Sequence, residues 1–244
     1  MASVVHVLAF TKGDHVCLFY RDLEDWTSTA APYVQLGLSR QERCFCVVPE
    51  EHALALRAAL RAVGVDLAAE ESRGTLVIQP PEKVYLPDGR FDGARMTGLL
   101  KTAVQDAVAH GFTGFRALGD LGWAARDARC CAQLPAYEAM MAEFYPHNPA
   151  VGLCTYDIRL FDVFQLQELM QLHQVALSLP EPAKRSIRLR HGSSYGDIVF
   201  DRSLPTVFHY AVLRDDSPAL VASGQEPSLN EAMSSVKTAL RRTG

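Results

Sequence analysis

Short apolar runs of strand length alternate, over the larger N-terminal part of the chain, with stretches whose apolar residues recur at helical spacing. The expected strands are HVCLFY (15–20), CFCVVP (44–49), TLVIQPP (75–81), GFRALGDLGW (114–123) and AVGLCTYD (150–157). The expected helices begin near residue 22 and cover about 50–64, 92–110, 130–145 and 161–177. Strands that are apolar on both faces and alternate with helices predict an α/β fold: a mostly parallel sheet covered by helices on both sides.

The pattern changes near residue 180. The runs GDIVFD, TVFHYAVLRD and ALVASGQ predict antiparallel strands, with RDDSPA as a hairpin loop. A final helix is expected because Ser228 and Glu231 have capping-box spacing. We interpret the basic segment KRSIRLRH (184–191) as a charged linker. The sequence therefore predicts an α/β domain over 1–180 and a small β-β-α unit, a hairpin plus a helix, over 181–244.

Composition and charge are those of an ordinary soluble globular protein. Of the 244 residues, 48% are hydrophobic and 21% charged, and the formal net charge of −4 gives no electrostatic reason to expect direct nucleic-acid binding. We expect no membrane span and no signal peptide, because the chain has no run of about 18 apolar residues and no basic, apolar leader. Six cysteines within apolar runs indicate free thiols in the cytoplasm.

Several catalytic motifs are absent from the sequence. It contains no Gly-Lys dipeptide and so no Walker A loop, whose amides and lysine would surround phosphates. It also lacks G-x-G-x-x-G, H-E-x-x-H and C-x-x-C. These absences argue against the common nucleotide-binding and zinc-protease classes.

A set of ordered blocks resembles a known family. GDHVCLFYRD, PYVQLGLSRQERCFCVV, YLPDGRFDGARMTGLL, GFRALGDLGWAARD, YEAMM and GLCTYD together resemble the MEDS (methanogen/methylotroph, DcmR-like sensory) domain over about residues 10–178. The resemblance implies a RecA/KaiC-like α/β fold with a degenerate P-loop. It also implies a ligand sensor in bacterial or archaeal signalling, associated with hydrocarbon derivatives and one-carbon metabolism.

The first strand-to-helix turn departs from a KaiC-like ATPase. Such an enzyme would carry Gly-Lys-Thr where this chain has YRDLEDWTST, and Asp22, Glu24 and Asp25 would repel a triphosphate there. We therefore expect no ATP cofactor and no ATPase activity. The chain shows no kinase block or helix-turn-helix, so its output is expected to lie elsewhere. The resemblance implies a histidine kinase or transcription regulator as the partner, because members of the family often occur beside such modules. The RecA-like relatives also make a homodimer plausible.

His15, Cys17 and Cys154 form a candidate metal site. His15 and Cys17 are two residues apart, so on a strand they project from the same face. If the sheet follows the KaiC-like order, the first strand neighbours the strand that carries Cys154. Imidazole and thiolate suit a transition metal. The alternative is that the cysteines are small core residues and that His15 is a hydrogen-bonded residue of the strand edge.

A second candidate site lies at the ends of the expected strands. Ligands of open parallel sheets bind outside the carboxyl ends of the strands. The residues at such ends are Tyr20, Asp120, Trp123, Tyr156 and Asp157. Aromatic walls with two carboxylates suit a small, mostly apolar ligand that carries a hydrogen-bond donor or a positive charge. The alternative is that the aspartates cap helices and the aromatics complete the core.

Three further polar residues are expected to be structural. Tyr137 and Glu138 belong to the YEAMM block, but helical tyrosine and glutamate are more often packing and surface residues. His173 is interpreted in the same way, as a lone histidine on an apolar helix.

Three functions remain open at this point. The first is a non-catalytic sensor that binds a small ligand, such as a hydrocarbon derivative or a metal, and passes the signal to a partner regulator. The second is an adaptor or oligomerisation protein without a ligand, whose C-terminal edge strand pairs with a partner. The third is an enzyme with Cys17 or Cys154 as its nucleophile.

Overall fold

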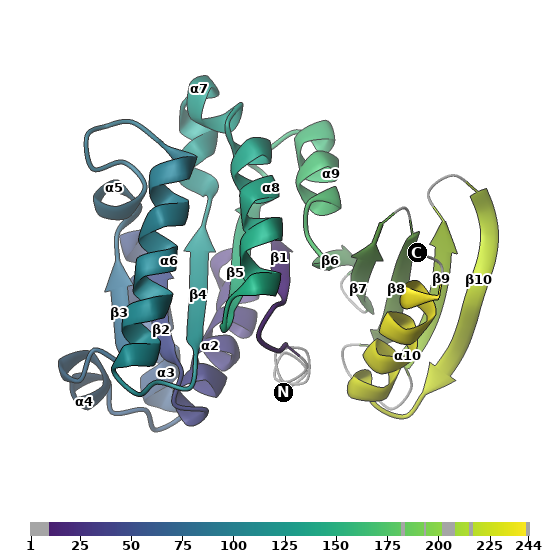
Figure 1. Cartoon of the computed structure of the whole chain (residues 1–244), viewed down its shortest axis with the longest axis horizontal. Helices are drawn as coiled ribbons and strands as arrows, with labels where there is room; N and C mark the ends of the chain where they lie inside the picture. The colour runs from purple at the N-terminus through teal and green to yellow at the C-terminus, as the bar shows by residue number, and fades with distance from the viewer. Residues whose placement is uncertain (1–9, 182–183, 193, 202–207, 215–216, 243–244) are drawn as a thin grey trace.

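One continuous sheet runs through the computed structural model (Figure 1), which describes residues 10–181, 184–192, 194–201, 208–214 and 217–242. Within these residues, ten strands are ordered β3-β2-β4-β5-β1-β6-β7-β8-β9-β10. Pairing is parallel from β3 to β6 and antiparallel from β6 to β10. The strands are β1 (His15–Tyr20), β2 (Arg43–Val47), β3 (Leu76–Gln79), β4 (Phe115–Asp120), β5 (Ala150–Asp157), β6 (Val175–Glu181), β7 (Lys184–His191), β8 (Ser194–Asp201), β9 (Phe208–Arg214) and β10 (Ser217–Glu226).

Helices cover both faces of the parallel part. In Figure 1, α6 and α8 lie in front of the sheet, and α2 and α3 lie behind it. The helices are α2 (Leu23–Ser39), α3 (Glu50–Ala62), α4 (Leu67–Ser72), α5 (Pro81–Val84), α6 (Gly93–Ala109), α7 (Ala128–Cys131), α8 (Leu134–Phe144), α9 (Val163–Gln171) and α10 (Leu229–Arg241), with 3₁₀ turns η1 (Gly122–Arg126) and η2 (Tyr145–His147). Every residue of β1, β4 and β5 is buried. The predicted α/β fold, a mostly parallel sheet between two helical layers, is confirmed.

The C-terminal unit differs from the predicted β-β-α arrangement. Four antiparallel strands, β7 to β10, precede α10, which packs against them. The segment interpreted as a charged linker is β7, in which the buried Ile187 and Leu189 alternate with arginines. Ser228 is the N-cap of α10 and accepts a hydrogen bond from the backbone N–H of Glu231, as its spacing predicted.

Strand β6 joins the two parts of the chain. The helix expected over 161–177 ends at Gln171, and Val175 begins β6. This strand pairs in parallel with β1 on one side and antiparallel with β7 on the other. Its first residues, valine, alanine and leucine, are buried against both neighbours, so an apolar run that continued the helical pattern forms a strand instead. The residue expected to be the domain boundary, near 180, lies within β6.

A buried ion pair fixes α2 against the sheet. Nε of Arg116 donates to Oε2 of Glu42 at 2.6 Å, and its guanidinium lies 4.5 Å from the centre of the Tyr33 ring. The Tyr33 hydroxyl lies 3.0 Å from the carbonyl oxygens of both Ala117 and Val151. Gly37 makes room for this pair, because a Cβ there would lie 2.5 Å from Cδ of Arg116.

We predict that Gly37→Ala destabilises the fold by about 1–3 kcal/mol, the usual range for overpacking a core. Gly98→Ala is the matched control: Gly98 is exposed on α6, and a Cβ there would meet nothing within 4 Å. The control is expected to stabilise the protein by up to about 1 kcal/mol, because alanine is the better helix former. Urea unfolding measures both changes, and equal effects of the two substitutions would contradict the packing argument.

Candidate functional site

The candidate metal residues meet where β1 lies beside β5. The two strands are parallel, with Cys17 opposite Cys154 and His15 opposite Gly152, which confirms that the first strand neighbours the one carrying Cys154. Nε2 of His15 lies 3.6 Å from Sγ of Cys154. Residues 15, 17 and 154 are all buried, so these side chains are enclosed between the sheet and the helices.

Glu138 and His173 complete this cluster, although neither was expected there. Glu138 extends from α8, and His173 lies in the short connection between α9 and β6. Oε2 of Glu138 is 3.1 Å from Nε2 of His15, 3.4 Å from Nε2 of His173 and 3.5 Å from Sγ of Cys154. One potential ligand atom from each of the four residues lies within 4.8 Å of all the others. We call His15, Glu138, Cys154 and His173 the buried centre.

Hydrogen bonds with neighbouring groups orient the potential metal-ligand atoms of the buried centre. Nδ1 of His173 lies 2.7 Å from the carbonyl oxygen of Leu169 and must therefore carry a proton. Within the described part of the chain, Nε2 of His173 makes no hydrogen bond, so in the neutral ring its lone pair is directed into the centre. The Tyr156 hydroxyl donates a hydrogen bond to Oε1 of Glu138 at 2.6 Å, which holds the carboxylate in place.

Burial and mutual contact set the charges of the centre. Burial alone would raise the pKa of Glu138, but the adjacent imidazoles of His15 and His173 hold this pKa well below its usual range. Burial and the neighbouring His173 lower the pKa of His15 to about 4. Burial opposes the charge on His173 as well, but Cys17, Cys154 and Glu138 raise its pKa well above the usual value. The directions of these shifts favour an ionised Glu138 beside a protonated His173.

The donor set fits a transition-metal ion. Two imidazole nitrogens, one thiolate and one carboxylate oxygen are the ligand types found in four-coordinate zinc sites. The Nδ1 contact of His173 with a backbone carbonyl is the outer-sphere arrangement that orients a metal-binding histidine. Cys17 is the neighbouring thiol, on the strand directly beside Cys154.

The residues predicted at the strand ends divide into separate groups. Tyr20 and Asp120 come together: the Tyr20 hydroxyl donates to Oδ2 of Asp120 at 2.7 Å and lies 3.1 Å from Nε2 of His52. Thr155 also donates to Oδ2 of Asp120, at 3.0 Å. Burial raises the pKa values of both Tyr20 and Asp120. The polar contacts of the Tyr20 and Asp120 side chains are thus made with each other and with His52 and Thr155.

The other three strand-end residues make their side-chain contacts with other groups, although Asp157 lies opposite Tyr20 where β5 pairs with β1. Trp123 stacks on Tyr85, with ring centres 5.0 Å apart. Tyr156 donates a hydrogen bond to Glu138 of the buried centre. Asp157 forms an ion pair with Arg159 at 2.6 Å and accepts a hydrogen bond from its backbone N–H. The structure therefore does not gather the five predicted ligand-binding residues into a single group of contacts.

Sequence reasoning assigned Glu138 and His173 to packing or surface, and both are fully buried in the centre. One signal pointed to Glu138: it lies within the YEAMM block, which is part of the family resemblance. His173 carried a weaker signal, its place two residues before the apolar run that forms β6. In addition, no helix in the described part of the chain is long and apolar enough to cross a lipid bilayer.

The chain is similar to several known proteins. A family model for MEDS, the methanogen/methylotroph, DcmR sensory domain, matches residues 14–174. The chain is 23% identical over 168 residues to the transcriptional repressor DcmR of Methylorubrum extorquens, a match that covers 68% of this chain and 60% of that protein. A KaiC-like protein from Pyrococcus horikoshii superposes with a TM-score of 0.47 and 16% identity, over 78% of this chain and 86% of the other. Because the family model spans more than half of the sequence, the chain belongs to the MEDS family of sensory domains.

Proposed function

We propose that this protein is a non-catalytic signalling protein whose buried centre binds a divalent transition-metal ion and passes the signal to a partner regulator. The observation that carries the proposal is the convergence of four donor atoms, from His15, Glu138, Cys154 and His173, within 4.8 Å of one another. All four residues are buried. Polar groups in such a position are costly unless they are paired or hold a cation.

Charge balance supports a divalent ion. With Cys154 as thiolate and Glu138 as carboxylate, the ligands carry two negative charges, and both imidazoles are neutral. A divalent cation would make the complete site neutral, which is the arrangement that burial favours. Binding would require Cys154 and His173 to lose a proton each.

A metal suits this position better than a hydrocarbon derivative, the other ligand class that the resemblance implies. The cavity beside Cys154 has a volume of about 20 Å³. A cavity of this size holds about one water molecule. An organic ligand would have to displace core side chains such as Tyr145, which also lines the cavity.

The location of His173 suggests how occupancy would be transmitted. His173 lies two residues before Val175, the first residue of β6. This strand connects β1 to the C-terminal strands through β7. In the proposed function, metal binding at His173 fixes the start of β6 and so the position of the C-terminal unit, which presents the signal to a histidine kinase or transcription regulator. The relative DcmR is a transcriptional repressor, which supports a regulatory output.

Two features support a protein without ATP chemistry. The side chain of Asp22 accepts the backbone N–H of Asp25 at 2.8 Å, so the start of α2 is capped by its own carboxylate. At the carboxyl ends of β1 and β4, the Tyr20 hydroxyl donates a hydrogen bond to Asp120. Both groups are engaged within the protein at the positions where a nucleotide would have to bind.

We predict that the purified protein binds Co²⁺ with visible absorption and a thiolate charge-transfer band. Cys154→Ser and His173→Gln should each weaken binding by at least about 100-fold, because even the outer partners of ligands contribute about 10–100-fold. Binding should weaken as the pH falls, since protons compete for the thiolate and imidazole.

The matched controls for this titration lie outside the buried centre. Cys131→Ser changes a half-buried thiol, and His110→Gln changes an exposed histidine. Both are expected to bind Co²⁺ as the parent protein does. A spectrum that persists in Cys154→Ser, or is lost in Cys131→Ser, would exclude the proposed centre.

We also predict that Cys17 and Cys154 resist alkylation in the native, metal-free protein at neutral pH, because both are buried. Cys131 is the most exposed of the six cysteines and should react first. Mass spectrometry of the labelled peptides measures the order. Preferential labelling of Cys17 or Cys154 would favour a cysteine-dependent enzyme over a sensor.

A further inference from the structure

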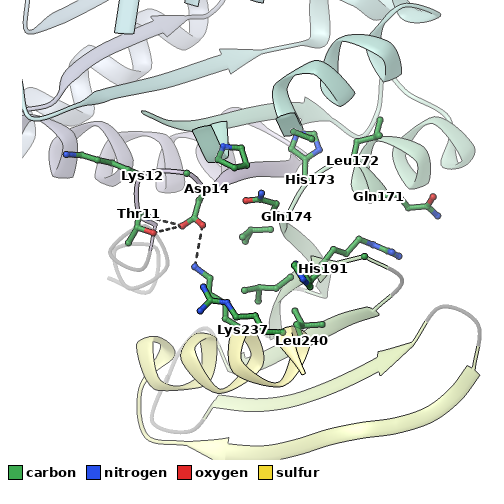
Figure 2. A pocket seen from close by; sticks show the side chains of 18 residues that line it. Thr11, Lys12, Asp14, Gln171, Leu172, His173, Gln174, His191, Lys237 and Leu240 are labelled. Atoms are coloured by element: carbon green, nitrogen blue, oxygen red, sulfur yellow. Dashed lines mark hydrogen bonds and ion pairs between the residues drawn. The ribbon is translucent and has the colours of Figure 1, made fainter. Parts of the chain in front are cut away.

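We call the segment that matches the MEDS family model, residues 14–174, the sensory part, and β7 to α10 the C-terminal unit. A cleft of about 590 Å³ lies between the two. Figure 2 shows it between the start of β1 and the α9–β6 connection on one side and α10 on the other. Cavities of about 300–1,000 Å³ are typical of small-molecule sites. The cleft therefore has the size of a ligand site and contacts both parts of the protein.

Positive charge is concentrated on the C-terminal wall of the cleft. Lys237 and Arg241 come from consecutive turns of α10, and Arg190 comes from the end of β7. Lys12 lines the opposite wall with its stem, but its ammonium donates to the carbonyl oxygen of Thr113 and points away from the cleft in Figure 2. In a chain with a net charge of −4, this local excess of cations favours an anionic occupant.

One carboxylate, that of Asp14, faces these cations across the cleft. Nζ of Lys237 lies 3.4 Å from Oδ1 of Asp14, the contact drawn as a dashed line in Figure 2. The other oxygen, Oδ2, accepts the backbone N–H of Thr11 at 2.8 Å. The Lys237 side chain is 34% exposed, and an ion pair as exposed as this contributes about 0–1 kcal/mol. A stronger anion can therefore replace Asp14 as the partner of Lys237 at little cost.

We propose that the cleft binds a small anion with two or more carboxylate or phosphate groups, held by Lys237, Arg241 and Arg190. Such a ligand would bridge α10 and β7 and would release Lys237 from Asp14. Binding would thus break the ion pair between Asp14, at the start of β1, and Lys237 of α10. This inference goes beyond the metal proposal, and neither depends on the other.

The test is isothermal titration of metal-free protein with succinate, citrate and pyrophosphate as separate probes, at constant ionic strength set by NaCl. We expect at least one of the three to bind, and which one binds distinguishes a carboxylate ligand from a phosphate ligand. Acetate, with one charge, should bind at least about tenfold more weakly, because it makes fewer charge-assisted hydrogen bonds. Titrations without heat from any of the three probes would overturn the proposal.

Substitutions that should weaken anion binding and one that should strengthen it locate the binding site. Lys237→Gln and Arg241→Gln should each weaken binding about tenfold, the effect of losing one charge-assisted hydrogen bond. Asp14→Asn should tighten it, because the competing carboxylate is neutralised while the side-chain oxygen that accepts from Thr11 is kept. Lys101→Gln, on an exposed position of α6 outside the cleft, is the matched control and should leave binding unchanged.

The same titration separates this proposal from the metal proposal. Cys154→Ser is expected to weaken Co²⁺ binding by at least about 100-fold and to leave anion binding within about twofold, because Cys154 is not among the residues that line the cleft. Equal weakening of anion binding by Lys101→Gln and Lys237→Gln, or no tightening in Asp14→Asn, would overturn the cleft as the site.

Discussion

The carboxylate of Glu138 is the group on which the interior of the sensory part depends. It is completely buried, and a buried carboxylate is tolerated only when donors or cations surround it. Tyr156 from β5, His15 from β1 and His173 from the α9–β6 connection supply those contacts. A single side chain of α8 therefore ties together two neighbouring strands and the segment that leads into β6.

This arrangement gives β6 a double role in the sheet. On one side it completes the parallel part beside β1, and on the other it begins the antiparallel part with β7. Buried apolar residues of α2, of β6 and of α10 also belong to one contiguous core, so the C-terminal unit is not a loosely attached tail. His173 lies two residues before the strand that both parts share, and the proposed signalling route is built on this position.

The strand ends illustrate how a fold keeps its framework while its chemistry changes. Tyr20 and Asp120 lie at the carboxyl ends of β1 and β4, where open parallel sheets bind ligands. Here the two side chains are hydrogen-bonded to each other, and Asp22 caps α2, the helix that follows β1. The side chains of Tyr20, Asp120 and Asp22 at this edge are thus hydrogen-bonded within the protein. Among the described residues, buried side-chain atoms without a hydrogen-bond partner occur both near this edge, at Nδ1 of His52 and Nε1 of Trp123, and in the buried centre, at Nε2 of His173.

Local patterns in the sequence were sufficient for most of the fold. Apolar runs identified β1 to β5, helical spacing identified their helices, and the position of His15, Cys17 and Cys154 on adjacent strands followed from the family resemblance. The strand β7 was missed although its arginines alternate with Ile187 and Leu189, because charge was given more weight than the period of two. The helix expected to reach 177 was too long, because periodicity cannot distinguish a short buried strand from a buried helical turn.

The buried centre was decided by the tertiary structure. Glu138 on a helix is ordinarily a surface residue, and only the approach of α8 to β1 and β5 makes it a partner for His15, Cys154 and Tyr156. His173 enters because α9 ends early and returns the chain beside β1. Residues 15, 138, 154 and 173 are far apart along the chain, and no local spacing records their contact. The sequence by itself determined which segments become strands and helices, because that depends on neighbours along the chain; the packing of those segments decided which polar side chains share one buried space.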